Sequence, residues 1–127
     1  MSSSEAAELA DVRVFVVEDE ALVAINLEDM LADLGCAGVV TAMRIDQAIE
    51  AVENGLAADV AILDVNLAGQ PVFPVAERLV ARGTPIVFAT GYGRSGLPEE
   101  WQSRPVLQKP YTMDEVAACL REARTPA

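Results

Sequence analysis

Residues 12–20, VRVFVVEDE, join a short run of β-branched and aromatic residues to three consecutive carboxylates. Such a run is typical of a buried β-strand, and the carboxylates begin where that strand should end. Four shorter runs of similar composition follow along the chain, at residues 39–40, 60–63, 86–89 and 106–107. The sequence therefore predicts five strands, separated by longer stretches with a different pattern.

The stretches between these runs carry apolar residues at helical spacing. Three helices are predicted at residues 23–34, 45–52 and 72–80, each followed by a glycine that suits a helix end, namely Gly35, Gly55 and Gly83. The last helix is marked by Thr112-Met113-Asp114-Glu115, which form a capping box, with Tyr111 and Val116 placed as a hydrophobic staple. Between residues 91 and 105, three glycines and two prolines leave only residues 98–102 as a helical turn. The fourth crossover is therefore expected to be loop-like, with a short helix or none.

Strands that alternate with helices, and that are apolar throughout rather than at every second residue, favour a parallel sheet covered on both faces. We therefore expect an α/β fold. A chain of 127 residues has the size of one ordinary domain, and no internal repeat or linker interrupts it. The pattern predicts one continuous domain.

The charge and hydropathy of the chain exclude several classes of protein. Twenty acidic residues against nine basic ones give a net charge of -11, which disfavours binding to nucleic acid or anionic lipid. No apolar stretch approaches the roughly 18 residues that a membrane span needs. Residues 1–10 lack the basic start and apolar stretch of a secretory signal. We expect a cytoplasmic protein that binds neither nucleic acid nor membranes.

Histidine is absent and there are only two cysteines, which excludes histidine catalysis and the usual zinc sites. Cys36 and Cys119 lie in or beside predicted helices, so we interpret them as buried free thiols without a function. Trp101 is interpreted as a packing residue or a partner contact, and the sequence does not separate the two.

Polar residues follow four of the five predicted strands. Glu18-Asp19-Glu20 follows the first, Asp64 the third, Thr90 the fourth and Lys109, the only lysine in the chain, the fifth. Each has an ordinary structural explanation when it is taken alone, such as a helix cap or a surface charge. Because the carboxyl ends of parallel strands meet at one edge of the sheet, however, these side chains should lie together.

Glu18, Asp19 and Asp64 would then crowd three carboxylates, an arrangement that is unfavourable without a compensating cation. Hard oxygen ligands, with no histidine or paired cysteine nearby, favour Mg²⁺. Lys109 would supply the remaining positive charge. The sequence predicts a magnesium site at this edge of the sheet.

Four segments, Val17-Glu18-Asp19-Glu20, Leu63-Asp64-Val65-Asn66, Ala89-Thr90-Gly91 and Gln108-Lys109-Pro110, resemble the signature motifs of the receiver domain of two-component response regulators. The resemblance covers about residues 12–122 and leaves residues 1–11 and 123–127 as tails, the first of them flexible. It implies a flavodoxin-like, doubly wound sheet of five parallel strands in the order 2-1-3-4-5. It also implies a single-domain response regulator that is phosphorylated by a sensor histidine kinase and signals through protein-protein contacts.

The resemblance also implies a role for each matching residue. Asp64 corresponds to the phosphoacceptor, Asp19 to the direct metal ligand and Glu18 to the acidic partner that holds the metal through water. Asn66 would offer its backbone carbonyl to the metal. Thr90 and Lys109 would each contact an oxygen of the phosphoryl group, and Lys109-Pro110 would be a cis peptide. Such a domain is a signalling phosphoprotein rather than an enzyme, since it catalyses only its own phosphorylation and dephosphorylation.

The switch residues depart from the usual pattern of receiver domains. Val106 stands where most receivers have a tyrosine or phenylalanine, while residues 88–92, Phe-Ala-Thr-Gly-Tyr, resemble a subgroup that is often single-domain and often paired with kinases of the HWE class. Thr90 is therefore expected to switch together with Tyr92 in place of the missing aromatic residue. The partner that reads the switch would be a downstream protein or a histidine phosphotransfer protein.

Three other kinds of protein share parts of this pattern. A phosphatase of the haloacid dehalogenase type needs a second carboxylate two residues after its nucleophile, but position 66 is Asn. A nucleotide or flavin module would need a glycine-rich phosphate loop where Glu18 to Glu20 stand. A pseudo-receiver, which binds a partner without phosphorylation, stays open because the residues alone do not exclude it.

Overall fold

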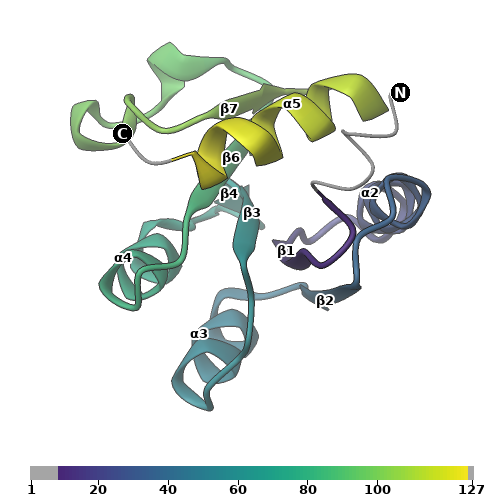
Figure 1. Cartoon of the computed structure of the whole chain (residues 1–127). Coiled ribbons are helices and arrows are strands. Elements are labelled where there is room, and N and C mark those ends of the chain that lie inside the picture. The colour runs from purple at the N-terminus through teal and green to yellow at the C-terminus, as the bar shows by residue number, and fades with distance from the viewer. Residues whose placement is uncertain (1–8, 126–127) are drawn as a thin grey trace.

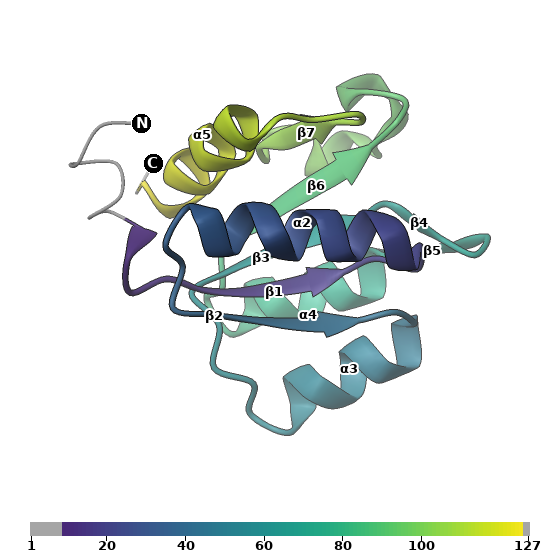
Figure 2. The same cartoon turned by 90° about the vertical axis from the view of Figure 1, so that its right-hand side faces the viewer.

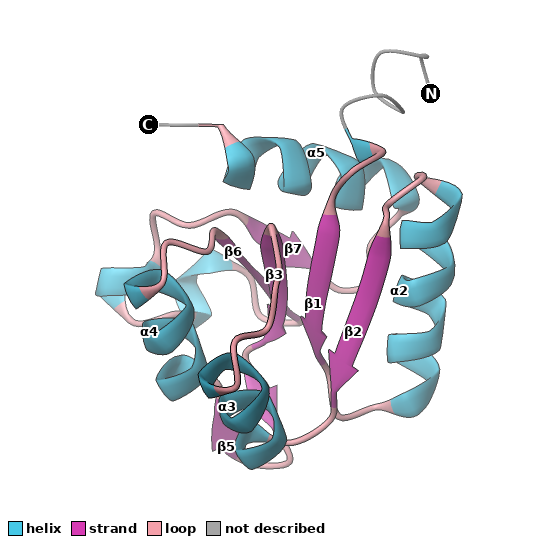
Figure 3. Ribbon diagram, turned by 60° about the horizontal axis from the view of Figure 1, so that its bottom comes forward, coloured by secondary structure: helices cyan, strands magenta, loops and turns pink. Residues whose placement is uncertain are grey.

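A five-stranded parallel sheet forms the centre of the structure, a computed structural model that describes residues 9–125 (Figure 1). Its strands are β1 (Arg13–Val17), β2 (Gly38–Ala42), β3 (Val60–Asp64), β6 (Ile86–Thr90) and β7 (Val106–Gln108), in the order β2-β1-β3-β6-β7. Since β6 and β7 are the fourth and fifth strands of this sheet, the predicted order 2-1-3-4-5 is confirmed. Figure 3 shows β1 and β2 with their arrowheads toward the same edge.

Within residues 9–125, four α-helices cover the two faces of the sheet (Figure 2). They are α2 (Ala21–Asp33), α3 (Ile45–Glu53), α4 (Phe73–Ala81) and α5 (Met113–Arg124). Helices α2 and α5 lie on one face, and α3 and α4 lie on the other. The predicted α/β architecture with helices on both faces is therefore confirmed. The predicted capping box is present too, because the Thr112 hydroxyl accepts from the Glu115 amide while the Glu115 carboxylate accepts from the Thr112 amide.

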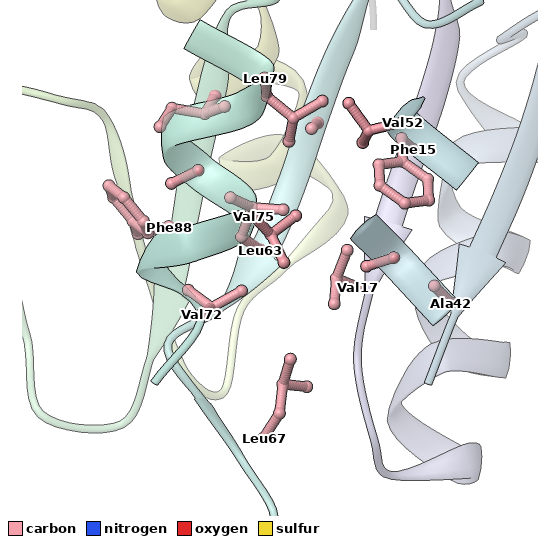
Figure 4. Close-up of a cluster of buried hydrophobic side chains, with 14 of the residues drawn as sticks. Phe15, Val17, Ala42, Val52, Leu63, Leu67, Val72, Val75, Leu79 and Phe88 are labelled. Carbon is pink, nitrogen blue, oxygen red and sulfur yellow. The ribbon is translucent and has the colours of Figure 1, made fainter. Parts of the chain in front are cut away.

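Alternate residues of each strand enter two separate cores, as the two-residue period of a strand requires. Phe15 and Val17 of β1 pack with α3 and α4, whereas Val14 and Val16 pack with α2 and α5. Figure 4 shows the first of these cores, where side chains from α4 meet the sheet. Strands β3 and β6 are buried at every residue, which explains why their sequences are apolar up to the last residue of each, Asp64 and Thr90.

The crossover between β6 and β7 contains two 3₁₀ turns, η1 (Arg94–Gly96) and η2 (Glu99–Trp101), instead of an α-helix. This agrees with the prediction of a loop-like connection with a turn near residues 98–102. Trp101 is only 8% exposed and packs against Phe73 and Phe88, with ring centroids 6.1 Å and 5.6 Å away. The tryptophan therefore fills the space under the crossover, which supports packing rather than a surface contact.

A small hairpin after β3 was not predicted. It consists of β4 (Asn66–Leu67) and β5 (Gln70–Pro71), which pair antiparallel around a turn at Ala68 and Gly69. Both turn residues have positive φ, 50° and 85°, as two-residue hairpin turns that match the strand twist require. Two-residue strands are too short to show a period in the sequence, so this element gave no recognisable signal.

The expected tails are only partly within the described residues. Residues 1–8 and 126–127 of the expected tails lie outside the described residues. Leu9 of the expected flexible segment is fully buried in the core with α2 and α5, and α5 continues to Arg124.

Cys36 and Cys119 are free, as expected, but half-buried rather than buried. Within residues 9–125, no helix is long and apolar enough to cross a bilayer.

Candidate functional site

The polar residues at the strand ends meet at one edge of the sheet, as the sequence predicts. Asp64 ends β3 and Thr90 ends β6, while Glu18 and Asp19 directly follow β1 and Lys109 directly follows β7. Glu18, Asp64 and Thr90 are the only polar or charged residues that are buried in the described part of the chain, with exposures of 3%, 8% and 5%. The buried polarity of this fold is therefore concentrated at one place.

Three carboxylates form a tight cluster at this edge. Glu18, Asp19 and Asp64 each offer an oxygen within 4.8 Å of the oxygens offered by the other two. The Lys109 Nζ donates to Glu18 Oε1 at 2.9 Å and lies 3.4 Å from Asp64 Oδ1. One ammonium group therefore faces three carboxylates, so the site holds an excess of negative charge.

Burial and crowding change the pKa values of these groups. Burial is the main reason that the pKa of Asp64 rises to about 7, and the neighbouring Glu18 carboxylate raises it further while Lys109 opposes the rise. Burial lowers the pKa of Lys109, but its hydrogen bond to Glu18 and the charge of Asp64 outweigh burial, so the pKa is raised overall. Lys109 therefore stays a cation, whereas ionisation of the Asp64 carboxyl is disfavoured.

Thr90 connects this cluster to the crossover between β6 and β7. The Thr90 hydroxyl accepts a hydrogen bond from the Tyr92 amide at 3.1 Å, and the Thr90 carbonyl accepts one from the Lys109 amide at 2.9 Å. The Tyr92 side chain is 83% exposed, and Val106 is half-buried in β7. The hydrogen bond from the Tyr92 amide therefore joins Thr90 to a residue whose aromatic side chain is on the surface.

Two further predictions concern Asn66 and the Lys109-Pro110 peptide. Asn66 lies two residues beyond Asp64, in β4, with an exposed side chain. The Lys109-Pro110 peptide is cis, as predicted. Glu18, Asp19, Asp64, Thr90 and Lys109 thus lie at the carboxyl edge of the sheet, and Asn66 and Tyr92 stand two residues beyond Asp64 and Thr90.

A family model, the response regulator receiver domain, matches residues 14–121. The chain belongs to this family. Receiver domains are signalling domains of two-component systems that bind Mg²⁺ at an acidic pocket, and this chain has an acidic cluster of Glu18, Asp19 and Asp64. The predicted family and fold are therefore confirmed.

Solved receiver domains resemble this chain over most of their length. The solution structure of SdrG from Sphingomonas melonis Fr1 is 45% identical, with a TM-score of 0.80 over 91% of this chain and 98% of that one. The BeF3-activated conformation of SdrG from Pseudomonas melonis Fr1 is 46% identical, with a TM-score of 0.77 over 89% and 96%. The PhyR receiver domain of Erythrobacter litoralis is 26% identical, with a TM-score of 0.76 over 94% and 98%. No match was found among curated proteins.

Two contacts in this receiver domain involve residues to which the sequence assigned no role. The Ala68 amide donates to Asp19 Oδ2 at 2.9 Å, and the Gln108 side chain donates to the Gly91 carbonyl at 2.9 Å. Gln108 therefore joins β7 to the residue after Thr90. Neither contact could be recognised from residue type, because one uses a backbone amide and the other a glutamine beside the motif lysine.

The pKa of Asp64 predicts how the stability of the receiver domain depends on pH without a divalent cation. An ordinary aspartate titrates near 3.9, so between about pH 4 and pH 7 Asp64 is ionised in the unfolded chain and protonated in the folded one. The stability that this proton contributes is complete below pH 4 and is lost as the pH rises through 7, on the order of 2–4 kcal/mol in total.

Urea unfolding in EDTA at several pH values measures this dependence. Asp64→Asn removes the titrating group, so the difference in stability between the two proteins should change between pH 4 and 7 and then level off. A difference that does not vary with pH would show that Asp64 has an ordinary pKa in the folded protein.

Proposed function

We propose that this chain is a response regulator that accepts a phosphoryl group on Asp64 from a sensor histidine kinase and signals by a phosphorylation-dependent contact with another protein. The observation that carries the proposal is the position of Asp64. Its carboxylate is buried at the end of β3, 3.4 Å from the Lys109 ammonium and within the cluster of three carboxylates. This arrangement combines a nucleophile with an ammonium group that can pair with phosphoryl oxygens and with carboxylates that can hold a cation.

The donor set of the cluster fits Mg²⁺. Glu18, Asp19 and Asp64 provide hard oxygen ligands, and the backbone carbonyl of Asn66 would provide another. The geometry supports the fit, because one ammonium group, that of Lys109, faces three carboxylates, and burial together with the neighbouring Glu18 carboxylate raises the pKa of Asp64 despite Lys109. When bound, the ion supplies positive charge that offsets the charge on the oxygens of the transferring phosphoryl group.

The residues of the chain would act as follows. An ionised oxygen of Asp64 attacks the phosphorus of a phosphohistidine, the new O–P bond forms, and the N–P bond breaks with its electron pair passing to the imidazole. The Lys109 Nζ, which lies 3.4 Å from Asp64 Oδ1, pairs with a phosphoryl oxygen. The hydroxyl of Thr90 accepts from the Tyr92 amide, which leaves its own proton free to donate to another phosphoryl oxygen. Attack by water on the phosphorus would later break the O–P bond to Asp64, which releases inorganic phosphate and the free carboxylate.

Labelling of the wild-type protein tests the proposal. Incubation with phosphoramidate and MgCl₂, followed by peptide mapping in a mass spectrometer, should place one phosphoryl group on Asp64. The BeF3-activated conformation of SdrG supports this expectation, because BeF3 resembles a phosphoryl group on a carboxylate. Failure to label under conditions that label another receiver domain would favour a pseudo-receiver instead.

The kinase is proposed to dock on α2 beside the cluster. Leu22 and Ile25 of this helix are 82% and 52% exposed, although both are large and apolar. An adjoining cavity of about 290 Å³ is lined by Val23, Asn26, Met30, Lys109, Pro110 and Tyr111. Lys109 belongs to both the cavity and the cluster, so a protein seated there would reach Asp64. A sensor kinase of the HWE class and a histidine phosphotransfer protein are the proposed partners.

Leu22→Ala is expected to slow phosphoryl transfer from the kinase about tenfold, because burial of a leucine in an interface contributes roughly 1–2 kcal/mol. Labelling by phosphoramidate should be unchanged, since the small donor does not need the docking surface. Val40→Ala is the matched control, as Val40 is 49% exposed but lies on the edge strand β2. The rate of transfer from a phosphorylated kinase measures the effect. Equal rates for Leu22→Ala and Val40→Ala would place the kinase elsewhere.

Tyr92 is proposed to report the movement of Thr90 to the partner. Tyr92→Ala should accept the phosphoryl group at the wild-type rate but lose most of the chemical-shift change that phosphorylation produces in residues 91–105. Tyr92→Phe, which keeps the ring, should behave as the wild type. Nuclear magnetic resonance of the phosphorylated proteins measures the effect. A full response in Tyr92→Ala would assign the switch to other residues.

A further inference from the structure

The β4–β5 hairpin, residues 66–71, follows Asp64 in the sequence and makes a hydrogen bond to Asp19, which comes after β1. Figure 2 shows the hairpin beyond the end of the sheet at which α2 begins. Its Ala68 amide donates a hydrogen bond to Asp19 Oδ2 at 2.9 Å, across 49 residues of sequence. We propose that this hairpin is a positioning element for the cation site, and that the Ala68 amide holds the Asp19 carboxylate ready for Mg²⁺. The inference rests on the cation site of the proposed function.

The hairpin is held firmly enough to act in this way. Leu67 is only 2% exposed and belongs to the same core as Val17, next to the cluster. The base of the hairpin is closed by the Val72 amide, which donates to the Val65 carbonyl at 3.0 Å. The location of the Ala68 amide is therefore fixed by packing in the core rather than by the exposed turn itself.

The geometry of the turn leaves the Ala68 amide available. Leu67 and Gln70 pair directly, so Ala68 and Gly69 are the two central residues of the turn. In such a turn the ladder uses the groups of the flanking residues, and the first central amide has no partner within the hairpin. Ala68 is the only non-glycine residue with positive φ in the described part of the chain. The residue with the unfavourable backbone conformation, Ala68, is thus the one whose amide contacts Asp19, a candidate metal ligand.

The hydrogen bond would assist cation binding in two ways. It holds one oxygen of Asp19 and leaves the other for the cation, so that the side chain loses less freedom when the ion binds. It also fixes the orientation of the ligand, as hydrogen bonds to metal ligands commonly do. A proline at position 68 would lack the N–H and could not take this role.

The experiment replaces a single backbone amide by an ester. Semisynthesis places lactic acid at position 68, which removes the N–H and keeps the methyl group. Glycolic acid at position 69 is the matched control, because the Gly69 amide makes no hydrogen bond within the described residues. Binding of MgCl₂ to each unphosphorylated protein is measured by titration calorimetry. The ester at position 68 should weaken binding roughly tenfold, whereas the ester at position 69 should leave it near that of the wild type.

A second measurement needs no variant. Binding of the ion and the Ala68 hydrogen bond should strengthen each other, so MgCl₂ should slow hydrogen exchange of the Ala68 amide in the wild-type protein. Equal affinities for wild type and both esters, equal weakening by both esters, or unchanged exchange at Ala68 would each overturn the inference. If the wild type itself binds no Mg²⁺, the cation site of the proposed function fails as well, and the calorimetry of the wild type separates the two failures.

Discussion

Asp64→Asn is expected to abolish phosphoryl acceptance while the protein stays folded. Asparagine has nearly the shape of aspartate, but its amide has no anionic oxygen to attack phosphorus, so the rate should fall by at least about 10³-fold. The buried position should tolerate the change, because a neutral amide removes one of three crowded carboxylates. Incorporation of phosphate from phosphoramidate and from a phosphorylated kinase, each with MgCl₂, measures the loss.

Asp59→Asn is the matched control for this prediction. Asp59 directly precedes β3 at the opposite end of the strand, where its Oδ2 accepts from the Arg13 amide at 2.8 Å. It should label as the wild type does, because it is remote from the cluster. Labelling of Asp64→Asn at the wild-type level would move the phosphoacceptor to another residue, and peptide mapping would identify it.

The arrangement of this site could be predicted from the sequence because two rules act together. Apolar runs located the five strands, and the alternation of strands with helices made the sheet parallel. Once the strands are parallel, the residues after Val17 and at Asp64, Thr90 and Lys109 must meet at one edge. The meeting of Asp64 with Lys109 at 3.4 Å therefore follows from topology, without any knowledge of side-chain contacts.

The parts that escaped prediction depend on interactions that residue types do not encode. The β4–β5 hairpin has strands of only two residues. The first residue of its turn is Ala68, which has positive φ, whereas glycine or asparagine at that position would be a recognisable turn signal. Trp101 is buried because the crossover folds over it. An aromatic residue in a loop-like segment does not by itself show whether its side chain faces the core or the surface. Leu9 is buried because it reaches the core with α2 and α5, although its neighbours in sequence are polar or small.

Lys109→Met is expected to be the most destabilising change of a charged residue at the site. Lys109 Nζ donates to Glu18 Oε1 at 2.9 Å, and Glu18 is only 3% exposed, so loss of the ammonium leaves a buried carboxylate without its partner. Removing one member of a buried ion pair costs about 3–5 kcal/mol. Because the Lys109 side chain is 23% exposed, the lower end of this range, roughly 3 kcal/mol, is expected. Urea unfolding in EDTA at pH 8 measures the loss.

Adding Glu18→Gln to Lys109→Met should recover most of the stability that Lys109→Met loses, since the double variant has neither charge of the pair. The loss caused by Lys109→Met alone should also be smaller at pH 5, because Asp64, with a pKa of about 7, then carries a proton and no longer adds to the unbalanced charge. Removal of Lys109 raises that pKa further, as the ammonium normally opposes the rise. If Lys109→Met matched the wild type at both pH values, the ammonium would not balance the carboxylates, and its place in phosphoryl transfer would lose its electrostatic basis.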